Sequence, residues 1–270
     1  MPTGQAATTQ LRRQIAESAR LAGVTRRLPS PIFLALLAMT VIGGVLTTFD
    51  THAAMTTGIV LLVLGGWAVS LCLHEFAHAY VAYRGGDGSV RAKGYLTLDI
   101  RRYTDPGLSI VLPLVLLLAG GLALPGGAVW INQHALRSPA VRSAVSLAGP
   151  LTNLLLGALL ALVMAVVPMP VGLAVGLSYL AFVQVLAFVL NILPVPGLDG
   201  FGAIEPYLSH EARRVANIVR PWAPLALFAL LITVAPLARL FFDVTYYVFT
   251  AVGGDPLAAS VGADEFMFWR

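Results

Sequence analysis

The sequence predicts an all-α polytopic membrane protein. Of its 270 residues, 58% are hydrophobic and only 11% are charged, whereas soluble domains carry about 25% charged residues. The apolar residues gather in six segments, most of which reach the ~20 residues that a membrane-spanning helix needs. These segments are roughly 31–49, 56–83, 107–124, 140–167, 171–194 and 222–250.

The first, second, fourth and fifth segments are simple candidates for spanning helices, and the other two are not. The third is marginal, because Pro113 lies in its middle and Gly120-Gly121 near its end. The sixth is too long for one span. Its breaks at Pro236, Arg239 and Asp243 divide it into a spanning helix and a following interfacial helix. The sequence therefore predicts five or six spans.

Lysine and arginine indicate which connections face the cytoplasm. Basic residues are concentrated in the N-terminal arm 1–30, in the loop 84–105 and in residues 205–220, whereas the connections 50–55 and 168–170 have none. Because cytoplasmic connections carry the excess of Lys and Arg, we expect the N-terminus and both basic loops on the cytoplasmic side.

The path of segment 107–124 stays open at this point. Arg137 and Arg142 suggest that the approach to the fourth segment is also cytoplasmic, and 107–124 would then be a re-entrant hairpin buried against other helices. The alternative is a full crossing, with both arginines outside. Only the hairpin puts residues 195–200 on the same face as His74 and His78, and the chemistry of the site favours it.

A His-Glu-x-x-His motif lies near the end of the second apolar segment. His74 and His78 are four residues apart on a predicted helix, so both imidazoles can bind one Zn²⁺. Glu75 lies where a carboxylate can take a proton from water at the metal. Ionisable groups at membrane depth are costly, at roughly 2.5–3.5 kcal/mol each. A metal or a water-filled pocket is therefore needed to compensate.

A catalytic zinc site uses three protein ligands and keeps one position open, so a third ligand is required. Asp199 is favoured because it closes the run 191–200, in which Pro194 and Pro196 forbid a regular helix. Irregular backbone at membrane depth is tolerated where it is buried in protein or lines a cavity, and an aspartate there is a good metal ligand. The remaining acidic candidates are Asp87, Asp99, Asp105 and Glu205.

Three motifs together carry a resemblance to a known family. They are His74-Glu-Phe-Ala-His78, Gly149-Pro150-Leu-Thr-Asn153 and Asn191-Ile-Leu-Pro-Val-Pro-Gly-Leu-Asp199-Gly200. In this order they resemble the site-2 protease family of intramembrane zinc metalloproteases, and specifically its compact branch without PDZ or nucleotide-sensing domains. The stretches 94–99 and 105–107 also resemble the loops that form a small membrane-surface hairpin in that branch.

The resemblance implies a ligand set and a set of roles. His74, His78 and Asp199 are expected to bind one Zn²⁺ per chain, and Glu75 is expected to act as the general base. Asn153 and Asn191 are expected to contact the substrate backbone near the metal. The implied activity is hydrolysis of a peptide bond in or near a transmembrane segment of a membrane protein substrate.

The chain is expected to have a basic N-terminal arm (1–30), a metalloprotease domain (31–250, with a catalytic core of about 56–200) and a C-terminal tail (251–270). We expect it in a prokaryotic plasma membrane, with the active site toward the cytoplasm. Nucleic acid is excluded as a partner, since the net charge of +4 comes from arginines that flank apolar segments. The alternative functions are a metal-binding membrane scaffold and a transporter.

Overall fold

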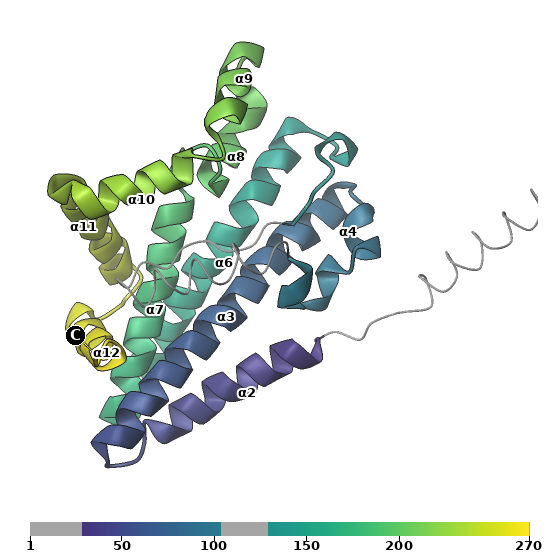
Figure 1. The fold of residues 1–270 in the computed structure, drawn as a ribbon. Helices are drawn as coiled ribbons and strands as arrows, with labels where there is room; N and C mark the ends of the chain where they lie inside the picture. Colours follow the sequence, from purple (N-terminus) through teal and green to yellow (C-terminus); the bar gives the residue numbers. More distant parts are fainter. Residues whose placement is uncertain (1–28, 104–128, 270) are drawn as a thin grey trace, which may run out of the picture.

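Three long helices form the centre of the structure. The computed structural model describes residues 29–103 and 129–269. Helices α3 (His52–Gly85), α6 (Pro139–Val166) and α7 (Val171–Asn191) pack against one another (Figure 1). Helix α2 (Pro31–Leu46) lies along α3, and α12 (Pro256–Phe266) packs on α7 near the end of the chain.

The other described elements are shorter and connect or flank this centre. Side-chain caps explain where α2, α3 and α6 begin. Oxygens of Ser30, Thr51 and Ser138 each accept a hydrogen bond from a free backbone N–H of the first turn, whereas α7 begins after Pro170 without such a cap. The shorter elements are α4 (Ser89–Ala92), η1 (Tyr95–Thr97), η2 (Ile100–Arg102), η4 (Gln133–Ala135), α8 (Asp199–Ile204), η5 (Glu205–Tyr207), α9 (His210–Val219), α10 (Ala223–Thr233) and α11 (Ala235–Ala251).

The described residues contain three helices long and apolar enough to cross a membrane, namely α3, α6 and α7. A fourth crossing results if α9 and α10, which meet at 64°, form one broken span. Helix α2 is apolar but has only 16 residues. An all-helical membrane protein is thus confirmed, while the predicted count of five or six spans is not. The third predicted segment, 107–124, lies outside the described residues.

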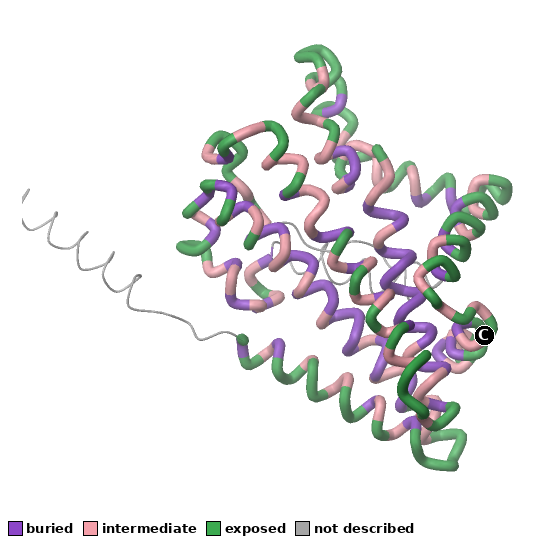
Figure 2. The backbone as a smooth tube through the Cα atoms, turned by 180° about the vertical axis from the view of Figure 1, so that it is seen from behind, coloured by how far each residue is buried: buried purple, intermediate pink, exposed green. Residues whose placement is uncertain are grey.

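Burial divides the three long helices into one central and two flanking members. In the most apolar 18-residue window of each helix, 78% of α7 is buried, against 61% of α3 and 28% of α6. Figure 2 shows the buried backbone concentrated in α3 and α7. The exposed face of α6 carries large apolar residues, and such a face is suited to lipid; these residues are Leu151, Leu155, Leu159, Leu162 and Val166.

No strand forms over 94–99, where the small membrane-surface hairpin was predicted, and its companion stretch 105–107 lies outside the described residues. Over 94–103 the backbone forms the 3-10 turns η1 and η2, and no strand occurs among the described residues. Gly94 and Leu98 have positive φ angles of 77° and 53°, which are turn conformations that interrupt extended backbone. Thr97 and Asp99 further stabilise the turns, through hydrogen bonds to Gly94 O and from the backbone N–H of Arg101.

The connections on both sides of the undescribed segment meet at the C-terminal end of α3. Tyr103 belongs to an apolar cluster there, and Val129 packs against the same cluster. Lys93 Nζ donates to Trp130 O at 2.8 Å, and Arg137 N donates to Gly85 O at 3.2 Å. The end of α3 and the start of α6 are therefore adjacent.

Residues predicted as a C-terminal tail contain α12, which is part of the helical assembly. Phe266 is fully buried and its ring lies 5.5 Å from that of Tyr179 on α7. Gly262 allows the close approach, because a Cβ there would lie 2.8 Å from the Tyr179 Cβ. Ser178 Oγ also donates to Asp255 O at 3.1 Å, so a hydrogen bond joins α7 to the cap of α12.

The contact between α2 and α3 generates a prediction about stability. A Cβ on Gly43 would lie 2.8 Å from Gly58 O and would also collide with Leu62 N, all backbone atoms that cannot move aside cheaply. We expect Gly43→Ala to destabilise the protein by about 1–3 kcal/mol. Thermal unfolding of the detergent-solubilised protein measures this effect. Gly44→Ala is the matched control, since its nearest neighbour would be a Leu173 methyl at 3.5 Å, and equal melting temperatures for the two variants would contradict the prediction.

Candidate metal centre

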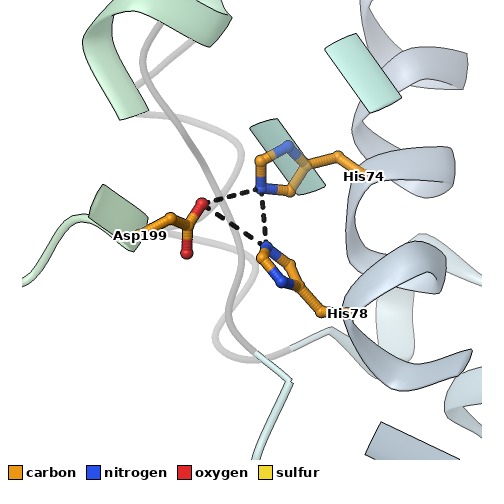
Figure 3. A group of neighbouring side chains, drawn as sticks. All are labelled: His74, His78 and Asp199. Atoms are coloured by element: carbon orange, nitrogen blue, oxygen red, sulfur yellow. Dashed lines mark hydrogen bonds and ion pairs between the residues drawn. The ribbon is translucent and has the colours of Figure 1, made fainter. Parts of the chain in front are cut away.

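His74 and His78 lie on the same face of α3 and point to one spot. Both imidazoles are buried, and their Nε2 atoms are 3.0 Å apart (Figure 3). This arrangement follows from their spacing, because residues four apart lie one above the other on a helix. The middle of a long helix holds them rigidly, so the two nitrogens present one fixed half of a metal site.

Asp199 supplies the second half from a different part of the chain. It is the first residue of α8, and its Oδ2 lies 3.3 Å from His74 Nε2 and 3.4 Å from His78 Nε2 (Figure 3). The preceding segment folds back tightly on the end of α7. Gly197 has a φ angle of 101°, and a Cβ on Gly200 would collide with Ile192 O. These two glycines allow the turn that brings Asp199 to the imidazoles.

The three side chains fit a zinc ion. In a tetrahedral site with zinc–nitrogen distances of 2.0–2.1 Å, donor atoms lie about 3.3 Å apart; the observed separations are 3.0, 3.3 and 3.4 Å. Space for the ion comes from Gly149 on α6. A Cβ at that position would lie 2.5 Å from His74 Nε2 and would also collide with His78 Nε2. No other such group of three His, Cys, Asp or Glu side chains was found among the described residues.

The opposite ring nitrogens hold both histidines in the form that binds a metal. His78 Nδ1 lies 2.6 Å from Val145 O, and because a carbonyl can only accept, this nitrogen carries the proton. His74 Nδ1 lies 2.5 Å from Asn153 Oδ1. Each Nε2 then keeps a lone pair directed at the site, which is the arrangement typical of metal-binding histidines.

Glu75 lies beside the three ligands without belonging to them. It is 2% exposed, and its Oε2 accepts a hydrogen bond from Val129 N at 3.2 Å. Val129 belongs to a segment that Asp87 anchors to the end of α3. Asp87 Oδ2 accepts from Asn132 N at 2.7 Å, and Oδ1 accepts from the N–H and hydroxyl of Ser89. A carboxylate that is buried, close to the metal ligands and not itself a ligand is suited to accept and release a proton.

The other predicted residues lie in two groups. Asn153 is buried on α6 and contacts the metal ligand His74, whereas Asn191 is buried at the end of α7 and donates to Ala187 O of its own helix at 3.0 Å. A substrate contact of either residue stays a prediction. Among the rejected acidic candidates, Asp99 pairs with Arg101 and Glu205 with Arg220. Asp105 lies outside the described residues.

Sequence reasoning missed Gln184. This residue is not one of the three candidate ligands, but it contacts Asn153, which in turn contacts His74. Asn153 Nδ2 donates to Gln184 Oε1 at 2.8 Å, and Gln184 is 1% exposed. The signal was present, because Gln184 is the one amide side chain in the run 171–190, which is apolar apart from Ser178 and Tyr179. A polar residue in such a run is expected to have a partner across a helix interface.

Comparisons with known proteins agree with the geometry. The chain is 44% identical over 246 residues to "Putative zinc metalloprotease Rip2" of Mycolicibacterium smegmatis. The match covers 89% of this chain and 94% of that protein. It is 42% identical over 247 residues to the protein of the same name in Mycobacterium tuberculosis, with the same coverage. A match to "Putative zinc metalloprotease YwhC" of Bacillus subtilis has 34% identity and covers 51% of this chain. No family model and no solved structure matches the chain.

The position of Gly149 generates a prediction about metal binding. We expect Gly149→Ala to weaken zinc binding by at least about 100-fold, because its methyl group would occupy the space between the two Nε2 atoms. Zinc content after purification and competition with a chromophoric chelator measure the effect. Gly44→Ala on α2 is the control, and a fully zinc-loaded Gly149→Ala protein would contradict the assignment of the ion's place.

Asp87 generates a prediction about pH. Burial alone would raise the pKa of its carboxyl, but hydrogen bonds from Ser89 and Asn132 outweigh burial and lower this pKa below its ordinary value. The stability that the carboxylate provides is therefore present above about pH 4 and is lost as the pH falls through the folded-state pKa. We expect Asp87→Asn to lower the melting temperature at pH 7, and the gap to the parent protein to narrow below about pH 4. Thermal unfolding between pH 3 and pH 7 tests this, and a constant gap would contradict it.

Proposed function

The chain belongs to the site-2 protease family of zinc metalloproteases, and from that premise we propose that it hydrolyses a peptide bond in or near a transmembrane segment of another membrane protein. The observation that carries this proposal is the position of Glu75. Its buried carboxylate lies beside His74, His78 and Asp199, on the same apolar helix as the two histidines. One Zn²⁺ per chain would be held by those three residues.

The chemistry divides between the ion and the protein. Bound by this triad, zinc polarises a peptide carbonyl and makes water more acidic. Glu75 accepts the proton of the attacking water and then delivers it to the nitrogen of the leaving amine. The N–H of Val129, which now donates to Glu75 Oε2, orients this carboxylate before a substrate arrives.

The burial of the site supports a substrate that comes from the membrane. His74, Glu75 and His78 are each at most 6% exposed and lie on a helix apolar enough to span a bilayer. A substrate helix keeps its scissile carbonyls hydrogen-bonded within the helix, so it must unwind locally before Glu75 can act.

The distribution of charge supports an active site near the cytoplasmic face of a prokaryotic plasma membrane. The basic loop after α3 and the basic helix α9 lie at the same end of the bundle as the start of α8 (Figure 1). Positive residues mark the cytoplasmic side of membrane proteins. The N-terminal arm 1–30, which carries five arginines, would lie on that side as well.

The competing functions are a metal-binding scaffold and a transporter. Both require a metal site, and neither gives a buried carboxylate next to the ligands a reason to be there. A glutamate that binds no metal, and whose burial is costly, is accounted for by proton transfer during hydrolysis. Proteolysis is therefore the function that this geometry supports best.

Glu75→Gln tests the proposal directly. We expect cleavage to fall by about 100- to 10,000-fold, because the amide cannot accept the proton, while the zinc content stays near that of the parent protein. Quantitative membrane proteomics of cells carrying either form measures the effect, and uncut single-pass proteins accumulating with the variant would be the substrates.

The outcome is interpretable only with a folded, zinc-loaded variant, so zinc content and melting temperature are measured on the same preparations. Loss of zinc from Glu75→Gln would contradict the assigned role. An unchanged membrane proteome in several growth conditions, with a loaded variant, would favour the scaffold.

A further inference from the structure

We propose that Gln184 is a positioning residue of the metal centre, which acts through Asn153 to keep His74 in its metal-binding form. The inference rests on the proposed zinc site and adds to it a residue on a third helix. The contacts form one chain of hydrogen bonds from α7 through α6 to α3. Gln184 Oε1 accepts from Asn153 Nδ2 at 2.8 Å, and Asn153 Oδ1 lies 2.5 Å from His74 Nδ1.

The direction of this chain matters because an amide has two different ends. Asn153 Nδ2 can only donate and its Oδ1 can only accept. When Gln184 accepts from Nδ2, Oδ1 is turned toward His74, and Nδ1 of that imidazole must carry the proton. Its Nε2 then has a free lone pair for the metal. A reversed Asn153 would present donors to Nδ1, place the proton on Nε2 and block metal binding by His74.

His74 depends on such a device more than His78 does. The partner of His78 Nδ1 is the backbone carbonyl of Val145, which can only accept and therefore fixes the ring without help. The partner of His74 is a side-chain amide, whose oxygen and nitrogen ends have nearly the same shape, so shape alone does not decide which end faces Nδ1. A further acceptor is needed to select the correct orientation, and Gln184 supplies it.

The close packing of α6 against α7 brings Gln184 within hydrogen-bonding distance of Asn153. Gly149, Asn153 and Gly157 are spaced by four residues along α6, so they share one face of that helix. Gly149 faces the two imidazoles, and Gly157 faces α7, where its Cβ would lie 2.9 Å from a Val185 methyl and 3.5 Å from Gln184 Cβ. The absence of a side chain at 157 thus draws α7 close to α6, one turn away from Asn153.

All three polar side chains in the chain of hydrogen bonds are deeply buried. His74 and Asn153 are each 4% exposed and Gln184 is 1% exposed. Water is therefore a poor substitute for a missing acceptor at Gln184. Outer partners of metal-binding histidines typically contribute about 10- to 100-fold to metal affinity.

The test compares two substitutions at one position in the full chain, purified in detergent. Gln184→Met keeps the length of the side chain but removes the strong acceptor, so we expect zinc affinity to fall about 10-fold or more. Gln184→Glu keeps an oxygen acceptor whether or not the new carboxyl is ionised, so zinc affinity should stay within about 3-fold of the parent. Chelator competition gives the affinities, and the visible absorption of the Co²⁺-substituted protein reports the ligand geometry.

A purely structural role for Gln184 predicts the reverse order. A buried carboxyl would then disturb the interface of α6 and α7 at least as much as methionine does. Ser178→Ala is the matched control, since it also removes a hydrogen bond from a fully buried side chain of α7, but one directed at Asp255 O and away from the metal. We expect it to leave zinc affinity unchanged.

A double substitution tests whether Gln184 acts through Asn153. If it does, Gln184→Met should add little to the loss of zinc affinity caused by Asn153→Leu, because the relay is already broken. Independent losses that multiply would overturn the proposed route. Equal zinc affinity for Gln184→Met and the parent protein would overturn the proposal itself. Failure of the parent protein to bind zinc would instead contradict the proposed function.

Discussion

The contact between α6 and α3 at Gly149 is the constraint on which the site depends. Two imidazoles one turn apart on α3 leave room for an ion only if the facing helix has no side chain there, and a single methyl at residue 149 would fill that room. The same face of α6 carries Asn153 one turn further on, so one helix leaves the space for the ion and holds one ligand beside it. The rest of the bundle keeps this face in register against α3 and α7.

Burying the polar groups of the site in an apolar protein costs free energy, and the structure shows which hydrogen bonds offset that cost. Each imidazole has a partner for its second nitrogen, and the carboxylate of Glu75 accepts a backbone N–H. Leaving any of these groups unpaired at this depth would cost several kcal/mol. These partners come from α6 and from the segment that begins at residue 129, and Gln184 of α7 in turn accepts from Asn153. The site is thus a product of the whole helical assembly, although its motif occupies five residues.

The sequence predicted which side chains meet at the candidate site, but not the residues that surround them. His74, His78 and Asp199 could be grouped from a fixed helical spacing and a break in an apolar segment, and the structure brings them together; their roles, and that of Glu75, stay predictions. Gln184 could be noticed as the one amide in its apolar run, but its partner Asn153 could not be predicted, since the contact depends on how closely α6 and α7 approach at Gly157. The absence of a strand at 94–99 has a related reason. A resemblance between loops does not reveal that Gly94 and Leu98 adopt turn conformations.

The number of spanning helices was also beyond the sequence alone. Apolar length identified α3, α6 and α7, but the segment 222–250 was divided at Pro236, Arg239 and Asp243 into a span and an interfacial helix. In the structure the break between α10 and α11 falls at Val234, and α10 joins α9 with a bend of 64°. Composition indicates that such a stretch is apolar. It does not show where the stretch bends.

The order of the candidate ligands along the chain has a consequence for the synthesis and folding of the protein. The histidines lie on α3, whereas Asp199 follows α7, so a metal held by all three would close a loop of 125 residues (199 − 74). During synthesis the donor set stays incomplete until α6 and α7 have left the ribosome and α8 has turned back on them. With the proposed ligand set, a nascent chain would hold only two nitrogen ligands until α8 is in place, and it would bind zinc weakly. The metal site would therefore close before α9 to α12, which follow α8 in the chain, have joined the assembly.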